Sequence, residues 1–491
     1  MRARYRACIL SLLVPLALQG QDIGLLRLDP TASGSRGTAQ VYGGYEAGGY
    51  HPAFAPSSLW KAGASAQGTR HGHRTSFTGS FSFEQIEGKD MFTSVFLEPG
   101  FFPVDVVEFT PGDKTRQTYR LGGGFATDLT DEFFFGIKAD YLSANYAKRK
   151  DIRHTTYGMN LRVEPTLAFR MFDNAGLSVS YIFQKRTESI DAEQVGAATD
   201  ASYYAFLDKG MRYGTYQVWD GDGIHLDEAG VGVFPVKEYR NGFAYSVDTP
   251  DFAGGMELLW KHGKVGEKGY DWFRYPGHSW SVFLERRWRS GQSLRLALTL
   301  EDDQLEEAVL DKVSSGGVTI PAVYGYNAVS DRNWCSLDLT WAARFQKGHL
   351  RRLQAILHGG LWAEHSYLMY PYEDRTDRYN GSLTLVSAFV FGPVDLGFRV
   401  NGGMGSWKEQ GLQGGTDSVV SAPFRLQADW DRKMEYFSTS KLGAGLTLTY
   451  HLKAVRGLYI QAEGTWLHGF GTVLLPGADR WSSTARVGYG F

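Results

Sequence analysis

Residues 441–451 read Lys-Leu-Gly-Ala-Gly-Leu-Thr-Leu-Thr-Tyr-His, and apolar side chains occupy every second position of this stretch. One face carries Leu442, Ala444, Leu446, Leu448 and Tyr450. The other face carries Lys441, two glycines, two threonines and His451. Successive side chains of a β-strand point to opposite faces, whereas a helical face repeats every three or four residues. The stretch therefore predicts a strand with one apolar face and one polar face.

The same alternation recurs along the chain, for example in residues 293–301, 336–345 and 395–401. Many of these runs reach ten residues, which is longer than the five or six residues usual in soluble sheets. Aromatic residues gather at the ends of the runs, as the girdles of a membrane barrel require. No apolar run after the N-terminal region reaches 18 residues, which excludes a helical membrane protein. We therefore predict an all-β fold, a transmembrane, antiparallel, up-and-down β-barrel.

The N-terminal region has the order of a secretory signal peptide, with arginines before an apolar run that ends in small and polar residues. We expect residues 1–20 to be this signal peptide, residues 21–37 to be a short periplasmic segment and residues 38–491 to form the barrel. After cleavage Cys335 would be the remaining cysteine, so an intramolecular disulfide is not expected.

Eight short connections separate the long predicted strands, and they alternate with longer ones. The short ones are residues 68–72, 128–131, 173–175, 248–252, 289–292, 346–349, 392–394 and 452–455. Because bacterial barrels have short periplasmic turns and long outer loops, the short set should face the periplasm. This assignment gives about 18 strands, with 14 or 16 as alternatives. The longest outer loops would be residues 87–115, 188–238, 305–332 and 410–435.

Two groups of residues are candidates for function inside such a barrel. The polar face predicts a lumen lined by Arg295, Asp338, Arg344, Asp395, Arg399, Lys441 and Glu463. Loop 87–115 is more apolar than a loop in water should be, and it contains Phe92, Phe96, Phe101, Phe102 and Phe109. These side chains must be buried in the lumen, against a partner protein or around an apolar ligand, or else pack on neighbouring loops.

Metal and catalytic motifs are weak or missing. Asp220, Asp222, Asp227 and Glu228 form an acidic, glycine-rich set of oxygen donors for Ca²⁺, but their order departs from an EF-hand loop and a solvated acidic turn explains them as well. The sequence contains neither G-x-S-x-G nor H-E-x-x-H. His365 and Ser366 are neighbours in a predicted strand, so they would face opposite sides and could not share one catalytic triad. We expect no cofactor and no enzymatic activity, with an outer-membrane enzyme as a remote alternative.

The C-terminal strand ends with Val487, Tyr489 and Phe491 on one face. This end resembles the C-terminal strand of outer-membrane barrels, which the barrel-assembly machinery reads. In layout and in this terminal motif, the chain is similar to a family of uncharacterised outer-membrane β-barrel proteins of Bacteroidota that lack a plug domain. The resemblance covers the whole mature chain and implies the fold and the bacterial outer membrane as location, but no site residues.

Charge and layout narrow the function to two classes. The net charge is −2 and no basic stripe is present, which argues against a nucleic-acid partner. A TonB-dependent transporter is disfavoured because only residues 21–37 would precede the barrel. The first class is a pore or transporter for small solutes, gated by outer loops and surrounded by outer-membrane lipid. The second is a surface receptor or accessory subunit that binds another outer-membrane or surface protein through those loops. The sequence favours the pore slightly, because the polar face persists around the predicted wall.

Overall fold

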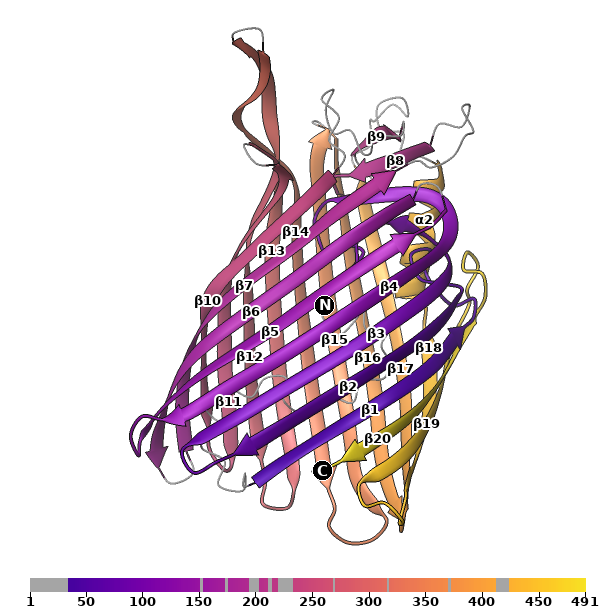
Figure 1. Ribbon diagram of the computed structural model, residues 1–491. Helices are drawn as coiled ribbons and strands as arrows, with labels where there is room; N and C mark the ends of the chain where they lie inside the picture. Colours follow the sequence, from indigo (N-terminus) through magenta and orange to yellow (C-terminus); the bar gives the residue numbers. More distant parts are fainter. Residues whose placement is uncertain are drawn as a thin grey trace.

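The structure is a computed structural model that describes residues 34–150, 153–172, 175–193, 203–210, 214–219, 233–267, 270–315, 318–369, 372–411 and 424–491. Twenty strands form one antiparallel sheet, and all of them except β8 and β9 make up a closed wall of 18 strands (Figure 1). The predicted class, an antiparallel β-barrel of about 18 strands, is confirmed.

The first half of the wall is built from β1 (Gly34–Ala47), β2 (Ser58–His71), β3 (Thr75–Ser94), β4 (Asp105–Asp128), β5 (Phe133–Lys148), β6 (Arg153–Phe172), β7 (Ala175–Glu193), β10 (Val233–Asp248) and β11 (Phe252–Glu267). The second half is built from β12 (Tyr270–Arg287), β13 (Gln292–Ser315), β14 (Val318–Arg344), β15 (Leu350–Met369), β16 (Tyr372–Phe391), β17 (Val394–Gly411), β18 (Lys441–His451), β19 (Leu458–Gly469) and β20 (Asp479–Gly490). Two short strands, β8 (Tyr203–Asp208) and β9 (Gly214–Trp219), and helix α2 (Phe424–Ser438) lie between wall strands in the sequence.

Each wall strand pairs with the next one along the chain, and two pairings complete the ring. β7 pairs directly with β10, so the β8–β9 hairpin is an insertion beside the wall. β1 pairs with β20 from Thr38–Gly490 to Ala47–Trp481, which closes the barrel. Since closure leaves no free sheet edge, the backbone hydrogen bonds of the wall are satisfied within it.

One end of the barrel, the turn end, carries the short connections. The described ones are residues 72–74, 129–132, 249–251, 288–291, 345–349, 392–393 and 452–457, close to the predicted positions. Gly291, Gly348 and Gly392 adopt positive φ angles in three of these turns, a conformation that favours glycine. The chain also ends at the turn end, where Phe491 exchanges backbone hydrogen bonds with Gly37 (Figure 1).

The opposite end, the loop end, differs from the predicted loops. β3 and β4 extend to Ser94 and from Asp105, so the predicted loop 87–115 is reduced to residues 95–104. The prediction of a loop at 305–332 is wrong, because β13 and β14 continue through this region as a paired hairpin that rises above the rim (Figure 1). Within 410–435, β17 continues to Gly411 and α2 begins at Phe424. No helix in the described part of the chain is both long and apolar enough to cross a bilayer.

Candidate functional site

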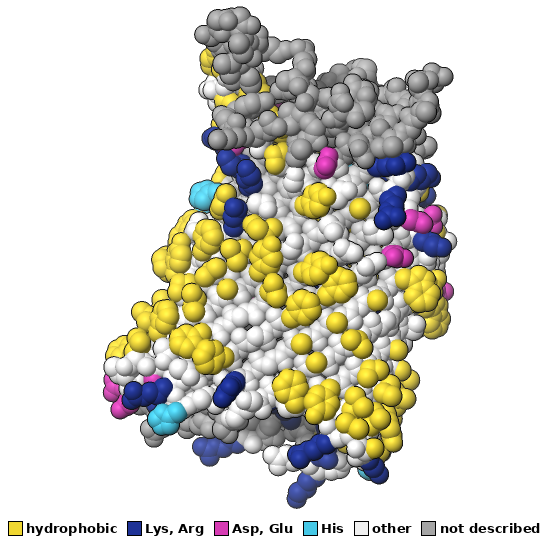
Figure 2. Space-filling view, viewed as in Figure 1, with side chains coloured by type: hydrophobic (Ala, Val, Ile, Leu, Met, Phe, Trp, Pro, Cys, Tyr) yellow, Lys and Arg dark blue, Asp and Glu magenta, His cyan; other side chains and the backbone are white. Residues whose placement is uncertain are grey.

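The two faces of the wall have opposite chemistry. Outward positions carry exposed apolar side chains such as Val41, Leu121, Leu357 and Val487, and Figure 2 shows such side chains spread over the visible side of the barrel. Inward positions carry hydrogen-bonding and charged groups, many of them buried. This alternation follows from the period of two in the sequence, because each strand contributes every second side chain to the lumen.

The residues predicted to line the lumen lie at inward positions and contact inward groups. Arg295 lies 3.6 Å from Glu285 of β12, Glu463 lies 3.3 Å from Arg486 of β20, and Asp395 lies 2.8 Å from His451 of β18. Asp338 contacts His358 of β15. The Lys441 ammonium lies 5.2 Å from the ring centroid of Tyr436 in α2. Arg344 and Arg399 are exposed.

Residues 95–104, which we name the inward segment, connect β3 to β4 and fold into the lumen. Thr156 of β6 donates a hydrogen bond to the Val95 carbonyl at 2.7 Å. The Leu97 amide donates to the Glu188 carboxylate of β7 at 3.1 Å. Arg332 of β14 contacts the same segment from the other side of the ring. Since β5, β6, β7, β10, β11, β12 and β13 separate β4 from β14 around the wall, a segment between β3 and β4 that contacts β14 must lie across the lumen.

Arg332 is the main polar anchor of the inward segment. Its guanidinium donates to the carbonyls of Gly100, Phe101 and Phe102 at 3.3, 3.1 and 2.8 Å. The same guanidinium makes two hydrogen bonds of 2.8 Å to the Asp303 carboxylate of β13. Arg332 is only 6% exposed, so these partners must stabilise its positive charge in place of water. Gly100 has a φ of 74°, which permits the tight turn that presents the three carbonyls.

A buried ion network supports the inward segment from the wall. Arg186 of β7 pairs with Glu188 and with Glu98 of the segment, and its guanidinium lies 3.6 Å from the Phe101 ring centroid. The network continues around the ring through Glu238, Arg240, Lys261 and Glu301 to Asp303, the partner of Arg332. The desolvation of these buried charges is offset only while each of them keeps its partner, and the loss of one partner leaves the other uncompensated.

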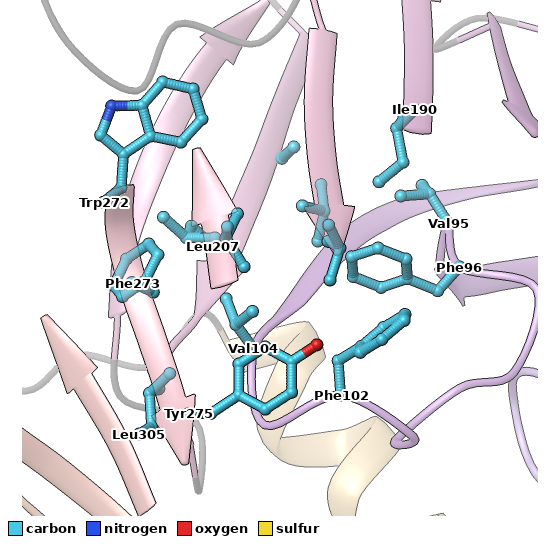
Figure 3. Packing of buried hydrophobic residues seen from close by; sticks show 14 of the residues in the cluster. Val95, Phe96, Phe102, Val104, Ile190, Leu207, Trp272, Phe273, Tyr275 and Leu305 are labelled. Carbon is cyan, nitrogen blue, oxygen red and sulfur yellow. The ribbon is translucent and has the colours of Figure 1, made fainter. Parts of the chain in front are cut away.

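The loop end also contains an apolar core inside the barrel. Figure 3 shows Val95, Phe96, Phe102 and Val104 of the inward segment facing wall residues. The wall residues and the β8 residue of this cluster that the figure labels are Ile190, Leu207, Trp272, Phe273, Tyr275 and Leu305. The Phe96 and Phe102 rings meet edge to face at 5.1 Å between centroids. The part of the lumen between the inward segment and these strands is therefore packed like a protein interior.

The five predicted loop phenylalanines have different surroundings. Phe96 and Phe102 are 1% and 3% exposed, and Phe101 packs against the same cluster. Phe109 lies in β4 and packs against Val107 and Phe206, while Phe92 lies in β3 and is half-buried. Three of the five therefore belong to the inward segment, and two belong to strands because β3 and β4 extend farther than the sequence indicated.

Helix α2 and the residues after β8 fill the remaining part of the loop end that the structure describes. Lys209 pairs with Glu307 of β13, and its carbonyl accepts a hydrogen bond from Ser330 of β14. In α2, Tyr436 packs with Tyr50, whose hydroxyl donates to the Tyr436 carbonyl at 3.2 Å. Met434 is fully buried. Three separate segments of the chain thus occupy the lumen at one level.

One titratable group of α2 is perturbed by this packing. Burial and, to a smaller extent, the positive charge of Arg378 in β16 lower the pKa of the Lys433 ammonium to about 8. The carboxylates of Glu364, Asp208 and Asp105 act in the opposite direction. The Lys433 side chain also lies 5.3 Å from the Trp430 ring centroid.

The remaining predicted sites stay predictions. Asp220, Asp222, Asp227 and Glu228 lie outside the described residues, and the described residues contain no cluster of three metal-ligating side chains. His365 is partly exposed and contacts Glu373, whereas Ser366 is fully buried and donates to the Val329 carbonyl. At the C-terminus, the Tyr489 and Phe491 rings stack at 6.1 Å, and Val487 is 46% exposed on the outward face.

Comparisons with known proteins add a family but no activity. Residues 27–491 match a family of unknown function, DUF6850. No curated protein matches the sequence. Solved structures with a similar course of the chain include the FrpB iron transporter from Neisseria meningitidis in its apoprotein form, with 10% identity, coverage of 94% of this chain and 82% of that chain, and a TM-score of 0.41.

Two other solved structures are similar to the same degree. The copper transporter OprC has 8% identity, coverage of 93% and 80%, and a TM-score of 0.41. BauA, the ferric preacinetobactin receptor from Acinetobacter baumannii, has 6% identity, coverage of 93% and 80%, and a TM-score of 0.42. At these scores the similarity carries no inference about what this chain does.

Proposed function

Because the chain belongs to the DUF6850 family, which has no assigned function, we propose one from the geometry of the barrel: a bacterial outer-membrane pore for small solutes that its own inward segment closes. The observation that carries the proposal is the inward segment itself, which crosses the lumen and is held there by Arg332, Thr156 and Glu188. Below it, toward the turn end, the inward face of the wall is polar and carries exposed charges such as Arg344 and Arg399. A polar lumen of this size suits a water-filled path.

The outer surface supports a place in the outer membrane. A barrel strand needs about 9–11 residues to cross the hydrocarbon layer. The shortest wall strand, β18, has 11 residues, and its outward Leu442, Leu446 and Leu448 are 39–49% exposed. Aromatic side chains including Trp481, Tyr489 and Phe491 are exposed on the outward face of the last strand and the chain end, where a girdle and an assembly signal would lie. The turn end then faces the periplasm, and lipid surrounds the wall.

The last residues of β3, which precede the inward segment, favour a segment that can move over one that fills the lumen permanently. Asp90 and Thr93 have φ angles of 57° and 74°, in the left-handed region. For a β-branched residue such as Thr93, this conformation is strained. The pairing of β3 with β4 is irregular between Gly88 and Thr93. Strain stored next to the segment lowers the free energy needed to move it out of the lumen.

A disulfide between the inward segment and β6 tests the proposal. A Cβ atom placed on Gly158 would lie 3.5 Å from the Leu97 Cγ atom, so cysteines at 97 and 158 are positioned to bond. The variant Leu97→Cys/Gly158→Cys is made in a Cys335→Ser background and studied in planar bilayers. We expect voltage-driven openings after reduction and none after oxidation, with Leu97→Cys alone insensitive to oxidation. Equal conductance in the oxidised and reduced double variant would contradict closure by this segment.

A second candidate function is favoured by the β13–β14 hairpin. It rises above the rim and exposes Val309, Leu310 and Tyr324 by 41%, 39% and 69% (Figure 1). Exposed apolar side chains on a rigid projection are typical of a surface that binds another protein. The barrel would then be a receptor or an accessory subunit. Replacement of the three residues by serine should remove a cross-linked complex from intact cells, and an unchanged complex would exclude this hairpin as the binding surface.

A further inference from the structure

The turn-end half of the lumen contains two arginines that face each other across neighbouring strands. Arg344 of β14 and Arg352 of β15 are direct partners in the antiparallel register. Both lie at inward positions, because Leu337 and Leu357 on the alternate positions of the same strands are 45% and 53% exposed to the outside. Like charges directly opposite each other in a sheet destabilise it, so this pair needs a compensating group.

The described carboxylates on the inward face around this pair have other partners, and Glu463, which interacts electrostatically with Arg399, lies 3.3 Å from Arg486. Asp338 of β14 contacts His358, and Asp395 of β17 lies 2.8 Å from His451. On β12, Glu285 contacts both Arg287 and Arg295. No carboxylate in the described part of the chain is within ion-pair distance of Arg344 or Arg352. The positive charge of the pair is therefore not neutralised by the protein.

Two further polar side chains complete a cluster around the pair. Arg352 donates a hydrogen bond of 2.6 Å to the Gln354 side-chain oxygen. Gln354 pairs with Val386 of β16, and Val386 pairs with Arg399 of β17, so Gln354 and Arg399 lie in one row of the wall. Three guanidinium groups and one amide thus project into the same part of the lumen, and all four can donate hydrogen bonds.

We propose that Arg344, Arg352, Gln354 and Arg399 form a binding site for a small oxyanion of the phosphate class. A guanidinium donates two parallel hydrogen bonds to such an anion, and opposed guanidiniums lose their repulsion when the anion lies between them. The site lies between the inward segment and the turn end. Given the proposed pore, a solute that passes the segment enters the part of the lumen where this cluster lies, so the cluster would favour anions. Binding itself does not depend on the pore.

The test measures the binding of inorganic phosphate to the detergent-solubilised full chain by isothermal titration calorimetry, at constant ionic strength with chloride as the competing anion. We expect saturable binding to the wild type and at least tenfold weaker binding to Arg344→Gln and Arg352→Gln. The matched control is Arg351→Gln, which removes the same charge from the neighbouring outward position and should bind phosphate as the wild type does.

A thermal unfolding series keeps the proposal falsifiable if binding is weak. Without phosphate, Arg344→Gln should melt at a higher temperature than the wild type because the repulsion is gone, and phosphate should raise the melting temperature of the wild type alone. Absence of saturable binding, or equal binding by Arg344→Gln, would overturn the proposal. That result would not contradict the proposed pore, because the pore is tested by the conductance of the disulfide variant without phosphate.

Discussion

The same strand, β14, places one arginine in each half of the lumen, and the two have opposite surroundings. Arg332, toward the loop end, is 6% exposed and donates to an aspartate and three carbonyls. Arg344, at the turn end, is exposed and faces another arginine. Both occupy inward positions of β14, in which inward and outward side chains alternate without interruption between the two arginines. The difference shows that the wall sets only the direction of a side chain, whereas the segments folded into the lumen decide whether it is a structural anchor or a group available to a solute.

The largest expected effect comes from removal of the anchor. Arg332→Ala leaves Asp303 with Lys261 alone and three carbonyls without their donor. Loss of one partner of a buried pair costs about 3–5 kcal/mol, so we expect the inward segment to leave the lumen. Hydrogen exchange of residues 95–104 should rise by orders of magnitude.

The matched variant is Arg399→Ala, which removes an exposed inward arginine at the turn end. It should leave hydrogen exchange of residues 95–104 unchanged. An equal rise in the two variants would mean that the halves are not distinct.

The apolar core of the loop end should respond next. Phe102→Ala removes a ring that is 3% exposed and contacts Phe96 and Tyr275. Truncation of a buried phenylalanine costs about 3–5 kcal/mol, and a segment that can relax places this case near the lower value. Phe109→Ala, from the smaller cluster, is the control and should cost less. Denaturant or thermal unfolding of both variants in the same detergent provides the measurement.

A smaller effect is expected at the end of β3, where Thr93 has a strained backbone conformation. Thr93→Gly removes the steric cost of a positive φ angle, and strain of this kind amounts to about 1–3 kcal/mol. We therefore expect the closed form to gain stability and voltage-driven openings to become rarer. Thr93→Ala, which keeps a Cβ atom at the strained position, should behave like the wild type. More frequent openings in the glycine variant would contradict a strained closed state.

The smallest effect is a pH dependence of α2. The pKa of Lys433 is lowered to about 8, below its value of about 10.4 in the unfolded chain. Between these two pKa values the unfolded state binds more protons than the folded state, so the free energy of unfolding rises with pH from about 8 to 10. The folding equilibrium constant rises by at most about tenfold per pH unit. Below about pH 8 both states are protonated and this contribution is constant. Lys433→Met should abolish the rise in melting temperature between pH 8 and 10, and an identical rise in that variant would assign it to other groups.

Most of the wall could be predicted from the sequence because its pattern is local. The alternation around Leu446 and the short turns give the strands, their inward faces and the parity of the barrel. The region 305–332 is the exception, because two register shifts in β13, at Leu305/Glu306 and at Val309/Leu310, interrupt the alternation of apolar and polar residues there. An alternating pattern indicates which side chains of a strand are buried. An exposed hairpin buries few side chains, so its pattern is weak.

The filling of the lumen could be predicted only in part. The excess of phenylalanines in 87–115 indicated burial, but not which surface would receive them. Their main anchor, Arg332, is separated from Phe102 by more than two hundred residues, and no local pattern reports such a contact. The sequence of α2 does contain a weak indication of a helix, because Trp430, Met434 and Phe437 recur at the spacing of one helical face.

The most direct test of the account is the single-channel conductance of a variant in which residues 95–104 are replaced by a flexible glycine-serine linker of equal length, with the wild type beside it. We expect the wild type to be closed at low voltage and the variant to show steady conductance, because its lumen has lost the inward segment. Steady conductance of equal size in the wild type, or silence in both proteins, would contradict the claim that this segment closes the pore.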